Sequence, residues 1–326
     1  MELADRPFKG PVRVDALRAD QIIDSRHQHG VVEHQQLRGE DRGLRLPDGT
    51  RHPCRDILEL RAGHGPCGAE PLTFGMTFPF STHNYQLRFW MAAGGVDPDE
   101  DVRLVVLPPP YMVDSLANGQ VDAFCVGAPW NSVAVDLGVG HILHFVSDIF
   151  QRAAEKVLAV REKWSIENSD VLARLTRAHA QAAEFIENPE NRPEVSRILG
   201  APERIGVDPE VVQRTLDGRL KISPDGTLRQ SDRYLLVGRD HAARPDPIQA
   251  AWLYAQMVRW GQARYAPDAL TRAKTVFRPD LYDAAHGLPP ASSSPAAGVG
   301  AFDGTPFDAA DIAGHLASVE IKHRLL

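Results

Sequence analysis

The chain has 326 residues, of which 43% are hydrophobic, so it is long enough for two domains or one large domain with a sizeable core. Its formal net charge of −7 excludes a general nucleic-acid binder, which would carry a basic surface. No run of residues approaches the roughly 20 apolar positions that span a bilayer.

The first 70 residues differ from the rest of the chain. They are rich in Arg, His and Gln and show no clear helical or strand period, so we expect an irregular or mis-framed segment. His27, His29 and His34 raise the idea of a metal site, but no carboxylate or cysteine completes a convincing ligand set. The composition therefore favours a polar irregular segment over a metal site.

The N-terminus and the cysteines indicate in which compartment the protein works. The N-terminus lacks the apolar core of a secretory signal, which predicts a cytoplasmic protein as the sequence stands. If the true N-terminus is missing, a periplasmic or membrane-associated protein is expected. Cys54, Cys67 and Cys125 form no CxxC pair and no zinc spacing, which favours reduced thiols. Cys125 lies in an apolar strand pattern and is predicted to be a core residue.

Residues 71–161 alternate strand and helix patterns. Strands are predicted at 72–78, 101–107, 120–126, 141–146 and 155–160, and helices at 82–95 and 111–119. This order predicts an α/β fold with a mostly parallel sheet and helices on both sides. Ligands of such sheets bind at the carboxyl ends of the strands. Three segments lie at predicted strand ends, at 80–84, 126–131 and 155–156.

Residues 162–285 are predicted to be mainly helical and to complete a second lobe. Amphipathic helices are expected at 169–188 and 246–262, with a loop and a short strand between them. His179 shares a helical apolar spacing with Leu172 and Leu175, which favours a partly buried helix residue over a ligand. The Pro-, Ser-, Gly- and Ala-rich residues 286–326 are predicted to form a loose C-terminal tail.

Common catalytic signatures such as GxSxG, GxxxxGK[ST], GxGxxG and HExxH are missing from the sequence. His83, Gly127 and Lys156 instead form a set of donors for a small oxyanion. A helix start near Ser81 offers unpaired N–H groups, a histidine and a lysine donate hydrogen bonds, and a glycine allows close approach to its own N–H. Taken singly, each has a plainer reading as a capping histidine, a turn glycine or a solvated lysine, and the residues alone leave both readings open.

The stretch "FPFSTHNYQLRFWMAAGGVDPDEDVRLVVLPPPYMVDSLANGQVDAFCVGAPWN" resembles the nitrate-, nitrite- and bicarbonate-binding proteins of ABC transporters, a family that includes cytoplasmic nitrate sensors. The likeness continues through "SDIFQRAAEKVLAV", "AKTVFRPDLYDAA" and "FDGTPFDAADIAGHL" and covers about residues 71–320. It implies a periplasmic-binding-protein-like (type II) fold of two lobes that close on a ligand. It implies no catalysis and no cofactor.

The resemblance also implies a ligand-binding set. His83 of the FSTHN motif, the backbone N–H of Gly127 and the side chain of Lys156 are expected to hold the anion, with Thr82 and Trp130 of the same two motifs beside them. A lysine at this position favours nitrate or nitrite, whereas an acidic residue assisted by calcium is expected in the bicarbonate branch. Glu155 precedes Lys156, so a register shift of one residue would reverse that inference. No metal site is expected.

Two departures from the family pattern concern this site. Ala128 stands in the turn "CVGAPWN" where the family often has Glu. The family's opening half-lobe, which contributes a tryptophan and a glutamine to the anion, is not recognisable in residues 1–70, and no tryptophan precedes Trp90. The first lobe is therefore expected to be incomplete and the site to bind weakly, because closure needs both lobes.

The resemblance leaves several roles open. The leading one is a nitrate- or nitrite-binding protein, either for transport with ABC membrane subunits or for sensing with an RNA-binding antiterminator. A bicarbonate-binding member of the family is one alternative. An enzyme on the same fold, of the kind that forms the thiamine pyrimidine, is another, but no cofactor-binding lysine or iron site can be assigned to it. A remnant that binds no ligand is the third.

Overall fold

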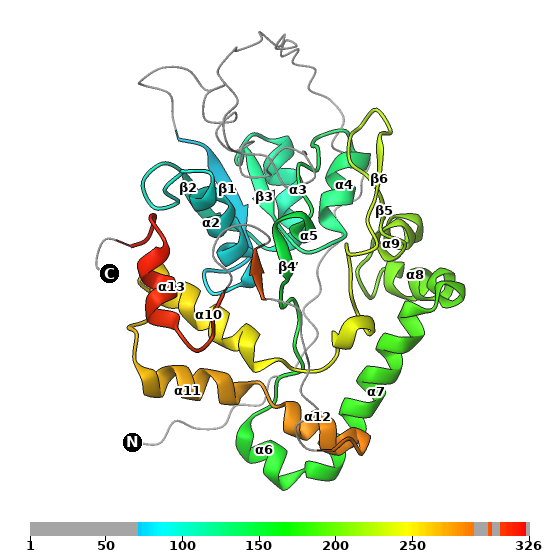
Figure 1. The fold of residues 1–326 in the computed structure, drawn as a ribbon. Coiled ribbons are helices and arrows are strands. Elements are labelled where there is room, and N and C mark those ends of the chain that lie inside the picture. Colours follow the sequence, from blue (N-terminus) through cyan, green and yellow to red (C-terminus); the bar gives the residue numbers. More distant parts are fainter. Residues whose placement is uncertain (1–70, 290–298, 302–306, 324–326) are drawn as a thin grey trace, which may run out of the picture. The chain divides into compact units, whose positions relative to one another are not determined.

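A computed structural model describes residues 71–289, 299–301 and 307–323 (Figure 1). The predicted irregular segment 1–70, with His27, His29, His34, Cys54 and Cys67, lies outside the described residues. The division into an α/β lobe, a helical part and a tail therefore stays a prediction as a whole, while the elements within it can be compared one by one.

The sheet nearest the predicted site has three parallel strands in the order β2-β1-β3. They are β1 (Thr73–Met76), β2 (Arg103–Val106) and β3 (Ala123–Cys125), joined by α2 (Thr82–Ala93) and α3 (Pro109–Ala117). Phe74 of the central strand lies opposite Leu104 on one side and Ala123 on the other. The first three predicted strands and both helices between them are confirmed. Because the strands are parallel, the turns that follow β1 and β3 meet at the same edge.

Helix α2 packs its apolar stripe against this sheet. Leu87, Trp90 and Met91 are buried together with Phe74 and Met76 in one hydrophobic cluster, and the side chain of Cys125 packs against it. Burial of a large apolar side chain contributes roughly 1.5–3 kcal/mol, so this cluster fixes the helix on the sheet. The helix ends at Gly94 and Gly95, and Gly95 has the positive φ of 79° that favours glycine.

Two predicted strands are wrong. Residues 141–145 are irregular and lead into α5 (Val146–Ile149), and residues 153–161 form no helix or strand. The strand in this region is β4 (Phe150–Arg152), which pairs antiparallel with β7 (Gly300–Ala301). Val157 and Leu158 of the predicted 155–160 strand are exposed. Their apolar pattern is typical of a strand, but a strand also needs a neighbour, and no described segment pairs with this one.

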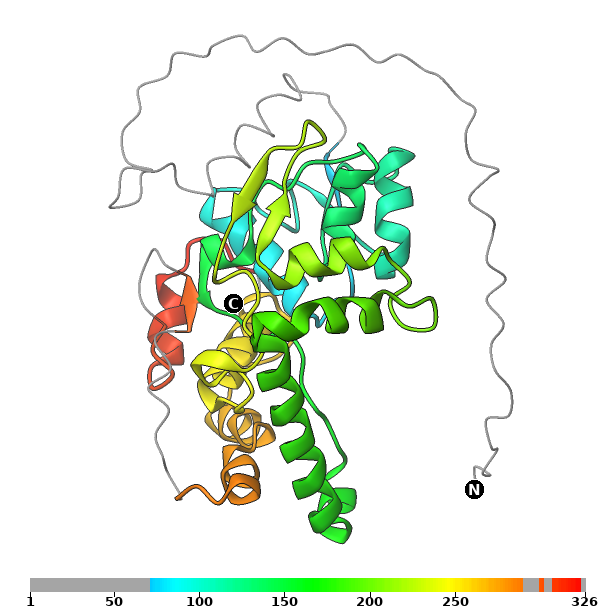
Figure 2. The same cartoon turned by 90° about the vertical axis from the view of Figure 1, so that its right-hand side faces the viewer.

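The two amphipathic helices predicted at 169–188 and 246–262 are confirmed as the longest of a series of helices that follows the sheet. The series holds α4 (Trp130–Asp136), α6 (Glu162–Glu167), α7 (Ser169–Glu187), α8 (Arg192–Gly200), α9 (Pro209–Leu216), α10 (Pro247–Arg259), α11 (Pro267–Val276) and α12 (Pro279–His286), with 3-10 turns at Pro189–Asn191 and Arg239–His241. The predicted loop and short strand form a hairpin of β5 (Arg219–Lys221) and β6 (Leu228–Gln230), which lies beside α9 (Figure 2).

The buried face of α7 differs from the predicted one. Leu172, Ala180 and Ala183 are buried, whereas His179 and Leu175 are exposed. The expected partial burial of His179 is therefore wrong. Both stripes have helical spacing, and which of them is buried depends on where α12 and α8 pack against α7.

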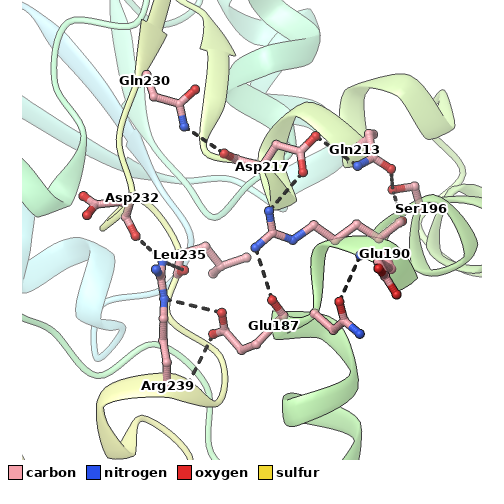
Figure 3. A network of polar contacts seen from close by, with 11 residues as sticks. Glu187, Glu190, Ser196, Gln213, Asp217, Gln230, Asp232, Leu235 and Arg239 are labelled. Carbon is pink, nitrogen blue, oxygen red and sulfur yellow. Dashed lines mark hydrogen bonds and ion pairs between the residues drawn. The ribbon is translucent and has the colours of Figure 1, made fainter.

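A polar network fixes the C-terminal end of α7 (Figure 3). Oε1 of Glu187 accepts hydrogen bonds from the backbone N–H groups of Val237, Gly238 and Arg239, at 2.8, 3.0 and 3.4 Å. Burial raises the pKa of this carboxyl, but the three N–H donors and the Arg239 guanidinium outweigh burial and lower it. The side chain is only 17% exposed, so this carboxylate is a fixed structural anion.

The expected loose tail is partly ordered. Helix α13 (Ile312–Ser318) packs on α10, and Ile312 is 1% exposed against Ala251 and Ala255. Residues 290–298, 302–306 and 324–326 of the predicted tail lie outside the described residues. Among the helices of residues 71–289 and 307–323, none combines the length and the apolar character needed to cross a membrane.

Candidate functional site

The first part of the candidate site follows strand β1. The chain turns through residues 77–81 and begins α2, where the hydroxyl of Ser81 accepts a hydrogen bond from the N–H of Asn84 at 3.2 Å. This is the helix cap expected from a serine at that position. His83 follows in the first turn of the helix and is 7% exposed. Its Nδ1 lies 3.4 Å from the hydroxyl of Thr77, so its Nε2 points away from that turn.

The second part follows strand β3, at the same edge of the sheet. Gly127 comes two residues after the strand, and Trp130 begins α4 after the Ala128–Pro129 peptide bond, which is cis. A Cβ added at Gly127 would lie 3.6 Å from Nε2 of His83 and 3.8 Å from Nζ of Lys156. Glycine therefore leaves open a small space that these two nitrogen atoms border.

The third part is the irregular segment after β4. Lys156 reaches the site although the predicted strand around it does not form. Nζ of Lys156 donates a hydrogen bond to Oε1 of Glu155 at 2.6 Å, and the same oxygen lies 3.2 Å from Nε2 of His83. The side chains of Glu155 and Lys156 thus both lie next to His83, so both residues of the predicted register line the site.

Glu155 is ionised in this setting. Burial alone would raise the pKa of its carboxyl, but hydrogen bonds and charge from His83 and Lys156 outweigh burial and lower the pKa to about 2. A carboxylate held by two donors therefore occupies the site at neutral pH. Sequence reasoning placed Glu155 in a segment at a predicted strand end and named it as a possible register error, but did not pair it with His83. The sequence feature that could have pointed to Glu155 was the acidic residue directly before Lys156. The proximity of Glu155 to His83 is visible only in the tertiary structure.

All five predicted site residues line one pocket. This pocket has a volume of about 540 Å³ and is lined by Thr82, His83, Gly127, Trp130 and Lys156. Phe80 of the predicted 80–84 segment also lines it, as do Thr77, Leu253 and Phe277, which sequence reasoning missed. A larger cleft of about 1560 Å³ shares His83, Gly127 and Lys156 with it. A mostly apolar wall with few directional donors is typical of small-ligand sites.

The site is suited to holding an anion. Cys125 ends the strand that leads to Gly127, and burial and the Glu155 carboxylate raise the pKa of its thiol to about 12, so the thiol stays protonated at neutral pH. Across the described part of the chain, no group of three or more His, Cys, Asp or Glu side chains could hold a metal ion. The converging donors are the histidine, the lysine and the first turn of α2.

Comparisons with known proteins agree on one family. The NMT1-like family matches residues 50–200. The nitrate/nitrite binding protein NrtA of Synechococcus elongatus is 30% identical over 81% of this chain and 61% of its own length. The crystal structure of the periplasmic nitrate-binding protein NrtA from Synechocystis PCC 6803 matches with a TM-score of 0.75 and 26% identity, over 82% of this chain and 70% of that chain. The chain belongs to the nitrate/nitrite/bicarbonate-binding protein family.

Two transport proteins are similar to this chain in sequence as well. The nitrate import ATP-binding protein NrtC of Synechocystis sp. is 32% identical over 77% of this chain, and the bicarbonate transport ATP-binding protein CmpC of Synechococcus elongatus is 30% identical over 92% of it. The chain spans 38% of the NrtC relative and 61% of the NrtA relative. The predicted periplasmic-binding-protein-like α/β fold is confirmed. The relatives named here are binding and transport proteins, which favours a binding role over catalysis.

Substitution of Gly127 by Ala tests the space between the donors. The new methyl group would lie 3.4 Å from Oε1 of Glu155, which is an ordinary contact, so the fold should tolerate it. It would fill the space that a small anion needs in order to approach the backbone N–H. We expect Gly127→Ala to keep the parent melting temperature and to weaken anion binding by about tenfold or more, measured by calorimetric titration, because one hydrogen bond to a charged group is lost. Unchanged affinity would place the anion elsewhere.

Proposed function

We propose that this chain binds nitrate or nitrite in the pocket formed by the turns after β1 and β3 and by the segment that carries Lys156. The observation that carries the proposal is the convergence of Nε2 of His83 and Nζ of Lys156 on the space in front of Gly127. A monoanion in this space would exchange its hydration for a charged donor, a ring N–H and backbone N–H groups at a helix start. The sequence similarity to nitrate-binding relatives supports the same ligand class.

Bicarbonate is the second candidate ligand, and Glu155 is the observation that favours it. The resemblance implies an acidic residue in the bicarbonate branch of the family, and Glu155 points into the pocket beside Lys156. A bicarbonate-transport relative matches at 30% identity. Bicarbonate carries a hydroxyl that can donate a hydrogen bond to a carboxylate, whereas nitrate and nitrite have no donor.

For the biological role we propose transport. The relatives that carry this likeness are named as nitrate or bicarbonate transport components, so ABC membrane subunits are the partners that we infer. The antiterminator partner and the cytoplasmic location expected from the sequence have no support among the relatives and remain predictions. The similar crystal structure is that of a periplasmic protein, and this location is a property of that protein.

The proposal is tested by a thermal-shift and calorimetric titration of the whole chain with nitrate, nitrite, chloride and bicarbonate, the last with and without calcium. We expect nitrate or nitrite to raise the melting temperature in a concentration-dependent way, because a ligand that binds only the folded state stabilises it by mass action. A rise with bicarbonate alone would replace nitrate by bicarbonate as the ligand. A folded chain that responds to none of these anions contradicts the proposed function.

A further inference from the structure

The proposed anion site already contains an anion from the chain itself. Oε1 of Glu155 takes both converging donors, Nζ of Lys156 at 2.6 Å and Nε2 of His83 at 3.2 Å. The same oxygen is 3.4 Å from the position of a Cβ on Gly127, which places it in the space assigned to a ligand oxygen. An incoming nitrate would need the single N–H at Nε2 of His83, which Oε1 of Glu155 already occupies. It would also share the Lys156 ammonium with a carboxylate of like charge at short distance.

We propose that the Glu155 carboxylate is an internal competitor that occupies the anion site and must leave it before nitrate or nitrite binds. This inference rests on the proposed function and adds to it the residue that sets the affinity. When no nitrate is bound, the Glu155 carboxylate takes the hydrogen bonds of Lys156 and His83. When nitrate binds, it replaces the carboxylate on these two donors.

The partial exposure of the Glu155 side chain is consistent with a group that can move out of the site. The side chain of Glu155 is 41% exposed, so it can turn toward water without unpacking its neighbours. Glu187, the other carboxylate described above, is 17% exposed and accepts three backbone N–H groups. Glu187 is therefore fixed, whereas Glu155 depends on two side chains, and the lysine is itself 78% exposed.

Competition has a measurable consequence. When only a fraction of the molecules has a vacant site, the apparent affinity falls by that fraction. Minor conformations are commonly populated at about 0.1–10%, so removal of the competitor should tighten binding by about tenfold or more. Removing the carboxylate also removes repulsion between two like charges at short distance.

The experiment compares nitrate titrations of the parent chain with Glu155→Gln and Glu155→Ala. Glutamine keeps the shape of the side chain and removes its charge, and alanine removes the group. We expect both variants to bind nitrate about tenfold or more tightly than the parent, in calorimetry at fixed pH and salt. Glu167→Gln is the matched control, because Glu167 is also exposed and paired with a lysine, Lys163, but does not line the pocket. Its affinity should equal that of the parent.

The outcomes separate this inference from the proposed function. Tighter nitrate binding by either folded variant supports the competitor, even when the parent shows no measurable binding. If the parent binds nitrate and neither variant binds it more tightly, the inference is wrong while the proposed function stands. If both variants lose the binding that the parent shows, Glu155 is a ligand contact and the inference is overturned. If the parent and both variants, all folded by their melting curves, bind no anion, the proposed function fails and the inference falls with it.

Discussion

Replacement of Lys156 by alanine is expected to reduce nitrate affinity by about tenfold to a hundredfold and to leave the fold intact. A hydrogen bond to a charged group contributes about 1.5–3 kcal/mol, and each 1.4 kcal/mol is a factor of ten in affinity. The side chain of Lys156 is 78% exposed and forms an ion pair with Glu155, itself 41% exposed, so its loss should cost little stability. Calorimetric titration gives the affinity, and the melting temperature without ligand gives the stability.

Two further variants complete this test. His83→Ala should lower affinity by a similar factor, because it removes the second donor in the pocket. Lys163→Ala is the matched control for Lys156→Ala, since Lys163 is an exposed lysine paired with Glu167 at 3.7 Å on α6. If Lys156→Ala and His83→Ala both bind nitrate as the parent does, the anion does not use this pocket.

Replacement of Asp283 by asparagine is expected to destabilise the fold by about 3–5 kcal/mol, because it leaves a charged partner unpaired inside the protein. Asp283 on α12 is 3% exposed. Its two carboxylate oxygens accept hydrogen bonds from Nε and Nη2 of Arg244, each at 2.7 Å. Chemical denaturation measures the free energy of unfolding. Asp280→Asn on the same helix is the control, because Asp280 and its partner Arg278 are exposed and such pairs contribute at most about 1 kcal/mol.

The same pair predicts how stability changes with pH. The hydrogen bonds from Arg244 hold the pKa of Asp283 below its ordinary value. In acid the unfolded chain therefore binds more protons at Asp283 than the folded chain does. The pair with Arg244 stabilises the fold fully above the ordinary aspartate pKa of about 3.9, and this stabilisation is lost as the pH falls through the pKa of Asp283 in the folded state. The free energy of unfolding of Asp283→Asn should change less with pH in this acid range. An equal acid dependence in parent and variant would contradict the assignment.

The local structure around the candidate site could be read from the sequence. The stretch from Pro71 to Trp90 predicted a buried strand, a short turn and a helix, because these signals are local: an apolar run in the strand, a serine at the cap and an apolar stripe along α2. The parallel order of strands then brought the turns of His83 and Gly127 to one edge. The long motif from Phe78 to Asn131 indicated the family, which the comparisons confirmed.

Other features were decided by the tertiary structure. Residues 155–160 have the pattern of a strand, but strand formation depends on a neighbour that the pattern does not supply, and none of the described segments pairs with them. The buried face of α7 depends on what packs against it, which placed His179 in solvent. The pairing of Glu155 with His83 joins residues 72 positions apart in the chain. A sequence determines such contacts only through the whole fold, because the energy of a contact between distant residues depends on where every element between them packs.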